Sequence, residues 1–267
     1  MSRYIQACDA LMLSKKPWRW ITVLLIILGD VMQNFTQIST AYGKVSYCEM
    51  LIYHMQNQTF AMVTAIILLA ILVGDAFRHS GWDAYYIFRT GSRKCLSISW
   101  IMLIAVYCLF LSVIYILSYS VIATLFNISL LPDPYNLNPD MLFLVQSGLH
   151  PLRACIMVLA LAFLRCCFLA QTVLWGNLLS RKLPLGILLL VFVGLILDYQ
   201  LYDIMKIDPI YILPYDNILL FPRGVRERPG YLFSFLYFLL INCGMSIAIF
   251  FKINKIDFGV TGDVCSK

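Results

Sequence analysis

The chain is poor in charge. Asp, Glu, Lys and Arg make up 13% of its 267 residues, about half the share of an average soluble domain. Hydrophobic residues instead account for 61%, and the mean hydropathy is +0.82. A chain of this composition is neither a soluble globule nor a disordered tail. Its net charge of +6 is spread along the chain between apolar stretches, so it does not indicate binding to nucleic acid.

Motifs for nucleotide binding and catalysis are also missing. Gly43-Lys44 is followed by Val45 and has no glycine upstream at the spacing of a phosphate-binding loop. The sequence contains no His-Glu-x-x-His motif, and we expect all three histidines (His54, His79 and His150) to lie outside the membrane spans. We therefore expect no enzymatic activity, no metal site and no cofactor bound by this chain.

The nine cysteines do not predict a disulfide framework. Most of them lie inside or beside apolar stretches, and Cys8 and Cys265 lie near the ends of the sequence. Cys48 is the single cysteine in a segment predicted to lie outside the membrane, so no bridge within the chain is expected on that side. We expect the cysteines to serve as small buried hydrophobic residues.

Six apolar stretches have the length of a membrane span. A helix needs about 20 residues to cross a hydrocarbon core of about 30 Å. The predicted fold is all-α, with six transmembrane helices in a single domain over residues 18–267. The predicted spans are 18–37, 60–77, 96–122, 154–174, 183–201 and 231–251.

An amphipathic helix is predicted over residues 1–17, because the apolar side chains of residues 4–12 share one helical face and Lys15 and Lys16 follow them. A cleaved signal peptide is the alternative interpretation of this basic start. Asp30, Gln33 and Asn34 disfavour it, because they interrupt the apolar stretch that a signal peptide requires.

The distribution of Lys and Arg places both termini in the cytoplasm, because more of these residues then lie on the inner side. The loop 78–95 is then cytoplasmic and the segment 202–230 lies outside. Arg223, Arg226 and Arg228 run against this bias, but they lie in a long segment where the rule weakens.

The predicted cytoplasmic loop has a helix of its own. Ser80 and Asp83 fit a capping box, and an aromatic and basic face follows at helical spacing. One interpretation is an anchor at the membrane surface, where Trp and Tyr are enriched. The other is a coupling helix that docks into a cytoplasmic partner. The residues concerned are Ser80, Trp82, Asp83, Tyr85, Tyr86 and Arg89.

A polar stripe follows one face of the first span. Asp30, Gln33, Asn34 and Gln37 recur at helical spacing, and we expect them to face the interior of the bundle or water, because lipid would not accept them. The alternative is that the helix ends near Val31 and that these residues belong to an outer loop.

Arg165 lies near the middle of the fourth span, at a depth similar to that of Asp30. An unpaired charge there costs at least about 2.5 kcal/mol, so we expect an ion pair between Asp30 and Arg165, with Asp75 as a second candidate partner. The alternative is that the Arg165 side chain reaches toward the inner surface.

The order of these parts resembles the permease subunit of a type-2 ATP-binding-cassette exporter, and is similar to bacterial permeases for export of, or immunity to, antimicrobial peptides. The likeness covers essentially the whole chain and is carried by its layout and by four local stretches. These are Phe88-Arg-Thr-Gly-Ser-Arg-Lys94, Asn177-Leu-Leu-Ser-Arg-Lys182, residues 210–221 and residues 233–258, which include Lys255-Ile-Asp257.

The resemblance implies a multi-pass protein of a bacterial cell membrane. It would pair with a second permease, either a copy of itself or a paralogue, and with a separate ATPase subunit that binds ATP and Mg. The coupling helix would sit in a groove of that ATPase. The first, second and fifth spans would line a cavity for an amphipathic or hydrophobic substrate, with a peptide favoured, and residues 202–229 would form a lid over its exit.

Two other functions remain open from the sequence. One is a membrane immunity or interaction protein that sequesters a membrane-active peptide without transporting it. The other is a secondary transporter, although the sequence contains neither a convincing internal repeat nor matching helix breaks.

Overall fold

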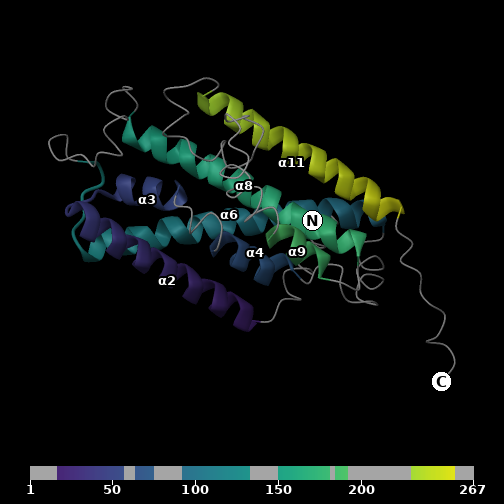
Figure 1. Ribbon diagram of the computed structural model, residues 1–267, viewed down its shortest axis with the longest axis horizontal. Coiled ribbons are helices and arrows are strands. Elements are labelled where there is room, and N and C mark those ends of the chain that lie inside the picture. The colour runs from purple at the N-terminus through teal and green to yellow at the C-terminus, as the bar shows by residue number, and fades with distance from the viewer. Residues whose placement is uncertain are drawn as a thin grey trace, which may run out of the picture.

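The computed structural model describes residues 17–56, 64–74, 92–132, 150–180, 184–191 and 230–255. Every regular element within these ranges is helical, and none of the described residues forms a strand. The long helices lie side by side along the longest axis of the molecule, and shorter helices pack against them (Figure 1). The elements are α2 (Pro17–Tyr42), α3 (Tyr47–Gln56), α4 (Ala65–Val73), α6 (Arg93–Leu125), α8 (Pro151–Leu179), α9 (Leu185–Val191) and α11 (Gly230–Lys255).

Four of the helices in the described part of the chain are long and apolar enough to cross a membrane. They comprise Pro17–Ala41, Arg93–Leu125, Pro151–Leu179 and Ser234–Lys255. They match the first, third, fourth and sixth predicted spans, each extended at one or both ends. The prediction of an all-helical, multi-pass membrane protein is therefore confirmed.

Several predicted elements lie wholly or partly outside the described residues. The second and fifth predicted spans are represented by α4 and α9, which cover only part of the ranges 60–77 and 183–201. The predicted amphipathic helix, the outer segment 202–229 and Asp75 lie outside the described residues. The same is true of the predicted coupling helix with Ser80, Trp82, Asp83, Tyr85, Tyr86 and Arg89.

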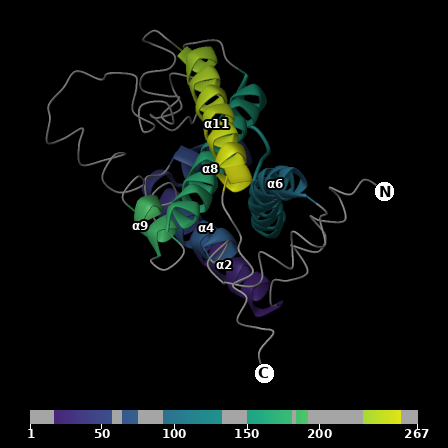
Figure 2. The same cartoon turned by 90° about the vertical axis from the view of Figure 1, so that its right-hand side faces the viewer.

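Contacts at the two ends of the bundle fix the relative directions of the helices. At one end the Arg93 guanidinium, where α6 begins, donates a hydrogen bond to the carbonyl oxygen of Asn254, where α11 ends (3.4 Å). At the other end the amide of Tyr47, where α3 begins, donates to the carbonyl oxygen of Ser129, after α6 (2.9 Å). Helices α6 and α11 are therefore antiparallel, and the end-on view places both of them against α8 (Figure 2).

Helix α3 is an element that the sequence analysis did not predict. Its ten residues are too few for a membrane span, yet it is buried against α2, α6 and α8. A capping box begins it: Glu49 Oε2 accepts hydrogen bonds from the amide and the hydroxyl of Ser46 (2.7 Å each), and the Glu49 amide donates to Ser46 Oγ (3.3 Å). This reciprocal cap gives the buried Glu49 carboxylate two donors.

Helices α8 and α9 make a close backbone contact through two glycines. A Cβ atom added at Gly176 would lie 2.5 Å from the Cα atom of Gly186 and 2.8 Å from its backbone nitrogen. Beside this contact, the Asn177 side chain in α8 donates a hydrogen bond to the carbonyl oxygen of Gly74, directly after α4 (3.2 Å). Small residues of this kind allow membrane helices to approach closely.

The glycine contact generates a stability prediction. Gly176→Ala should lower the thermal stability of the detergent-solubilised protein, by about 1–3 kcal/mol, because the added methyl group meets backbone atoms that cannot move aside. Gly29→Ala in α2 is the matched control, since a Cβ at Gly29 meets no atom of the described structure within 4 Å. The control should be neutral or slightly stabilising. Equal losses of stability in both variants would contradict the proposed close contact.

Candidate functional site

The described structure contains a buried polar cluster between α2, α3 and α6, and its central group is the carboxylate of Asp30. Helix α2 turns one apolar row inward, and Val23, Ile27 and Val31 are at most 1% exposed. Asp30 lies beside this row, and Asn34, which is 3% exposed, continues it. Because the helix runs to Tyr42, these polar residues belong to the helix and not to an outer loop.

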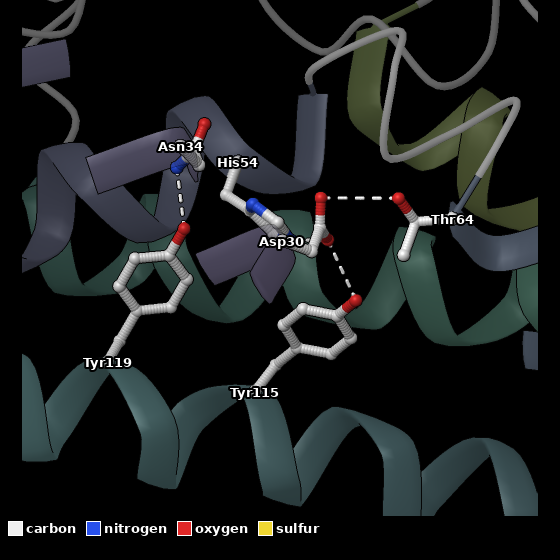
Figure 3. A network of polar contacts seen from close by, with 6 residues as sticks. All are labelled: Asp30, Asn34, His54, Thr64, Tyr115 and Tyr119. Carbon is white, nitrogen blue, oxygen red and sulfur yellow. Dashed lines mark hydrogen bonds and ion pairs between the residues drawn. The ribbon is translucent and has the colours of Figure 1, made fainter. Parts of the chain in front are cut away.

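Three side chains from different segments contact the Asp30 carboxylate. The Tyr115 hydroxyl in α6 donates a hydrogen bond to Oδ2 (2.9 Å), and the Thr64 hydroxyl, directly before α4, donates to Oδ1 (3.2 Å). The Nε2 atom of His54 in α3 lies 3.3 Å from Oδ2. The side chains of His54 and Asp30 are only 1% and 12% exposed. Figure 3 shows the carboxylate between Thr64 and Tyr115, with the imidazole beside it.

The cluster extends one helical turn further along α2 and α6. The Asn34 side-chain amide donates a hydrogen bond to the Tyr119 hydroxyl (2.5 Å). The His54 ring packs between two tyrosine rings, with centroid distances of 4.9 Å to Tyr115 and 5.4 Å to Tyr119 (Figure 3). Asn34 Oδ1 is buried and accepts no hydrogen bond from the described residues. A buried acceptor of this kind is a point at which a ligand or a water molecule can bind.

The surroundings of the cluster are apolar. A small cavity lies on one side of Tyr115 and is lined by residues that include Met55, Leu69, Leu111 and Cys166. In such surroundings an isolated carboxylate would be strongly disfavoured. The hydrogen bonds and the imidazole are therefore what allow Asp30 to remain inside the bundle. Chemically, the arrangement can hold a proton between carboxylate and imidazole, or bind a cationic group against the carboxylate.

The predicted polar stripe divides into two pairs. Asp30 and Asn34 face the interior of the bundle, as predicted, whereas Gln33 and Gln37 are exposed on the surface of the described structure. The reason is geometric. The four residues of the stripe spread over a wider part of the helix surface than the face that α2 buries against α3 and α6.

The predicted ion pair between Asp30 and Arg165 is not formed among the described residues. Arg165 is 3% exposed in α8, but the polar partners of Asp30 are His54, Thr64 and Tyr115. The sequence correctly placed both groups inside the bundle. The sequence does not indicate toward which neighbouring helix the side chains of Asp30 and Arg165 point. That direction determines the partner of Asp30.

Four residues of the cluster were missed by the sequence analysis: His54, Thr64, Tyr115 and Tyr119. His54 was expected outside the membrane spans, and it does belong to the short helix α3, but that helix is buried in the bundle. A signal was present, because Tyr115 and Tyr119 lie one turn apart in a predicted span, with the same spacing as Asp30 and Asn34.

Comparisons with protein-family models, with curated proteins and with solved structures find no match to this chain. Among the described residues, no group of three or more His, Cys, Asp or Glu side chains is arranged to hold a metal ion. The function of the cluster must therefore be inferred from its own chemistry and from its place in the bundle.

A double-mutant cycle tests the central contact of the cluster. Asp30→Ala and Tyr115→Phe should each destabilise the solubilised protein, and their effects should be coupled by about 1–2 kcal/mol because each change removes the same hydrogen bond. Unfolding free energies of the two single variants and the double variant measure this coupling. Gln33→Ala combined with Tyr115→Phe is the control, and its effects should add, since Gln33 is exposed on the same helix. Simple additivity in the Asp30 cycle would contradict the contact.

Proposed function

We propose that this chain is the membrane permease subunit of an ATP-driven exporter. In this proposal a second permease, identical or paralogous, completes the translocation path, and a separate ATPase subunit binds ATP and Mg. The substrate is amphipathic or hydrophobic, with a peptide favoured by the family resemblance. The ATPase would engage the cytoplasmic loop 78–95 through Trp82, Tyr85, Tyr86 and Arg89.

The observation that carries the transport part of the proposal is the polar cluster around Asp30. Ionisable groups are costly inside a membrane bundle, and they are typical of substrate and ion pathways. Here one carboxylate has three partners from three other segments, and the amide oxygen of Asn34 remains available inside the bundle. A purely structural bundle could fill the same space with apolar side chains at lower cost.

The exposed half of the polar stripe supports a second permease. Gln33 and Gln37 lie on the surface of α2, on a helix that otherwise exposes large apolar residues such as Leu25 and Met32. Two amides facing lipid would be unfavourable. They would be accommodated if this part of α2 faced the translocation path between two permeases.

The proposed orientation follows from the charges at the ends of the bundle. The end at which α2 and α6 begin and α11 ends carries most of the described Lys and Arg side chains, and we assign it to the cytoplasm of a bacterial cell. Both termini would then be cytoplasmic. The residues at this end are Arg19, Arg93, Lys94, Lys252 and Lys255, against Lys44 and Arg153 at the other.

The ATPase coupling is tested by copurification. The tagged full chain, extracted in mild detergent from its native host, should retain an ATP-binding-cassette ATPase subunit. Trp82→Ala, Tyr85→Ala and Tyr86→Ala combined should reduce the retained ATPase by about tenfold or more, because aromatic side chains dominate interface energies. Trp18→Ala is the matched control: it removes an aromatic side chain that is 55% exposed at the same end of the bundle, and it should leave retention unchanged.

Two results would contradict this coupling. One is a complete absence of ATPase from the wild-type sample. The other is equal retention by the triple variant and by the Trp18→Ala control.

A second candidate function is transport driven by an ion gradient, and the pairing of Asp30 with His54 is the observation that favours it. Carboxylate and imidazole groups inside a membrane are typical of proton relays. Vesicles that contain this chain alone, given an imposed membrane potential and a pH-sensitive dye, distinguish the candidates. The ATP-driven proposal expects no proton flux above that of protein-free vesicles. The second candidate expects a flux that Asp30→Asn abolishes and Gln33→Ala does not.

A further inference from the structure

Two cysteines far apart in the sequence meet at one end of the bundle. Cys48 is the second residue of α3, and Cys155 lies about one turn after the start of α8 at Pro151. These two helices pack against each other, which places both residues near the end of the bundle where α2 and α6 finish and α8 begins (Figure 1). From the sequence alone, Cys48 is expected outside the membrane without a partner, and Cys155 inside an apolar stretch. The packing of α3 brings the two together.

The contact between these residues is direct. The Cys155 Sγ atom donates to the carbonyl oxygen of Cys48 (3.6 Å). Cys48 is 1% exposed and Cys155 is 6% exposed, so the packed helices hold both sulfurs in place. On the Cys48 side, the capping box of Ser46 and Glu49 fixes the start of the helix.

A second thiol pair provides an internal comparison. Cys108 and Cys167 are also neighbouring buried thiols, but they lie near the middle of α6 and of α8. A water-soluble oxidant cannot reach the middle of a membrane bundle, whereas the end of the bundle is accessible while the chain folds. Position along the helices therefore separates a pair that can be oxidised from one that stays reduced.

We propose that Cys48 and Cys155 form an intrachain disulfide at the end of the bundle assigned to the outside of the cell. The bridge would join α3 to α8 and close a loop that spans 107 positions of the sequence. It would act on the polar cluster indirectly, by fixing the helix that carries His54. This inference uses the proposed orientation, but it does not depend on ATPase coupling or on any substrate.

The chemistry is thiol–disulfide exchange with a disulfide of an exported oxidoreductase or of a small thiol. The Cys48 thiolate attacks the oxidant disulfide, which forms a mixed disulfide and releases one thiolate. The Cys155 thiolate then attacks the Cys48 sulfur, forms the intrachain bridge and releases the second thiolate. Two cysteine thiols are thereby oxidised, the oxidant disulfide is reduced to two thiols, and both thiol protons pass to water or to the released thiolates.

The surroundings of Cys48 favour the first of these steps. The Cys155 thiol beside it lowers the pKa of the Cys48 thiol, because an S–H donor stabilises the thiolate. A larger thiolate fraction speeds attack on a disulfide once α3 and α8 meet and before packing buries the two sulfurs. Once α3 is packed against α8, burial of both sulfurs protects the bridge from reductants.

Thiol counting tests the bridge in the full chain. Cells with an oxidising outer compartment express the protein, thiol exchange is stopped with acid, and the chain is labelled with a maleimide in denaturing detergent. Intact mass then gives the number of labels. Wild type labelled without prior reduction should carry two fewer maleimide groups than wild type labelled after reduction. Peptide mapping of the unreduced sample should recover a linked peptide that contains Cys48 and Cys155.

Serine variants assign the bridge to its residues. Cys48→Ser and Cys155→Ser should each carry the same number of labels before and after reduction. Cys108→Ser is the matched control, because it breaks the inner thiol pair, and it should keep the difference of two. Equal label numbers in the two wild-type samples would overturn the proposal. So would a difference of two that survives in Cys48→Ser but disappears in Cys108→Ser.

Discussion

The arrangement of α2, α3 and α6 depends on one constraint: a carboxylate on a membrane-spanning helix must find its partners inside the protein. Asp30 meets this constraint with side chains from three other segments, namely His54, Thr64 and Tyr115. No single neighbouring helix supplies all of them. The contacts therefore define how α2, α3, α6 and the start of α4 lie relative to one another, while apolar packing alone would permit many arrangements.

The membrane-spanning helices could be predicted from the sequence because hydrophobic length is a local property. About twenty apolar residues must form a helix in lipid, whatever the rest of the chain does. The ends were less accurate, and α2 illustrates the reason. Its last turns contain Thr36, Ser39 and Thr40, whose hydroxyls donate to carbonyl oxygens of the preceding turn. These bonds satisfy the hydroxyls within the helix, so the polar residues do not end it, and it runs to Tyr42.

The candidate site could be predicted only in part. Sequence spacing correctly indicated that Asp30 and Asn34 face inward, but it gave Asp30 the wrong partner. Depth in the membrane can be estimated from a residue count, whereas the direction in which a side chain points around the bundle depends on how the helices pack. Arg165 and Asp30 share a depth by that count, and packing gave Asp30 the side chains of α3 and α6 instead.

Helix α3 was missed because its length matches none of the patterns that identify a span, and its polar residues resemble those of a loop. The information was nevertheless present. Ser46 and Glu49 form a capping-box motif, and apolar residues follow at helical spacing, at Cys48, Leu51, Ile52 and Met55. The missed helix also explains the missed thiol pair, because Cys155 meets Cys48 only when α3 packs against α8.

The cap at the start of α3 fixes the position along the bundle at which His54 lies. Ser46 and Glu49 determine where the helix begins, and the number of residues from there to His54 determines how far along the bundle, and in which direction, the imidazole is delivered. Each residue added between these points would advance the ring by about 1.5 Å and swing it through about 100°. Natural variation in this stretch should therefore tolerate exchange of side chains far better than any change of length.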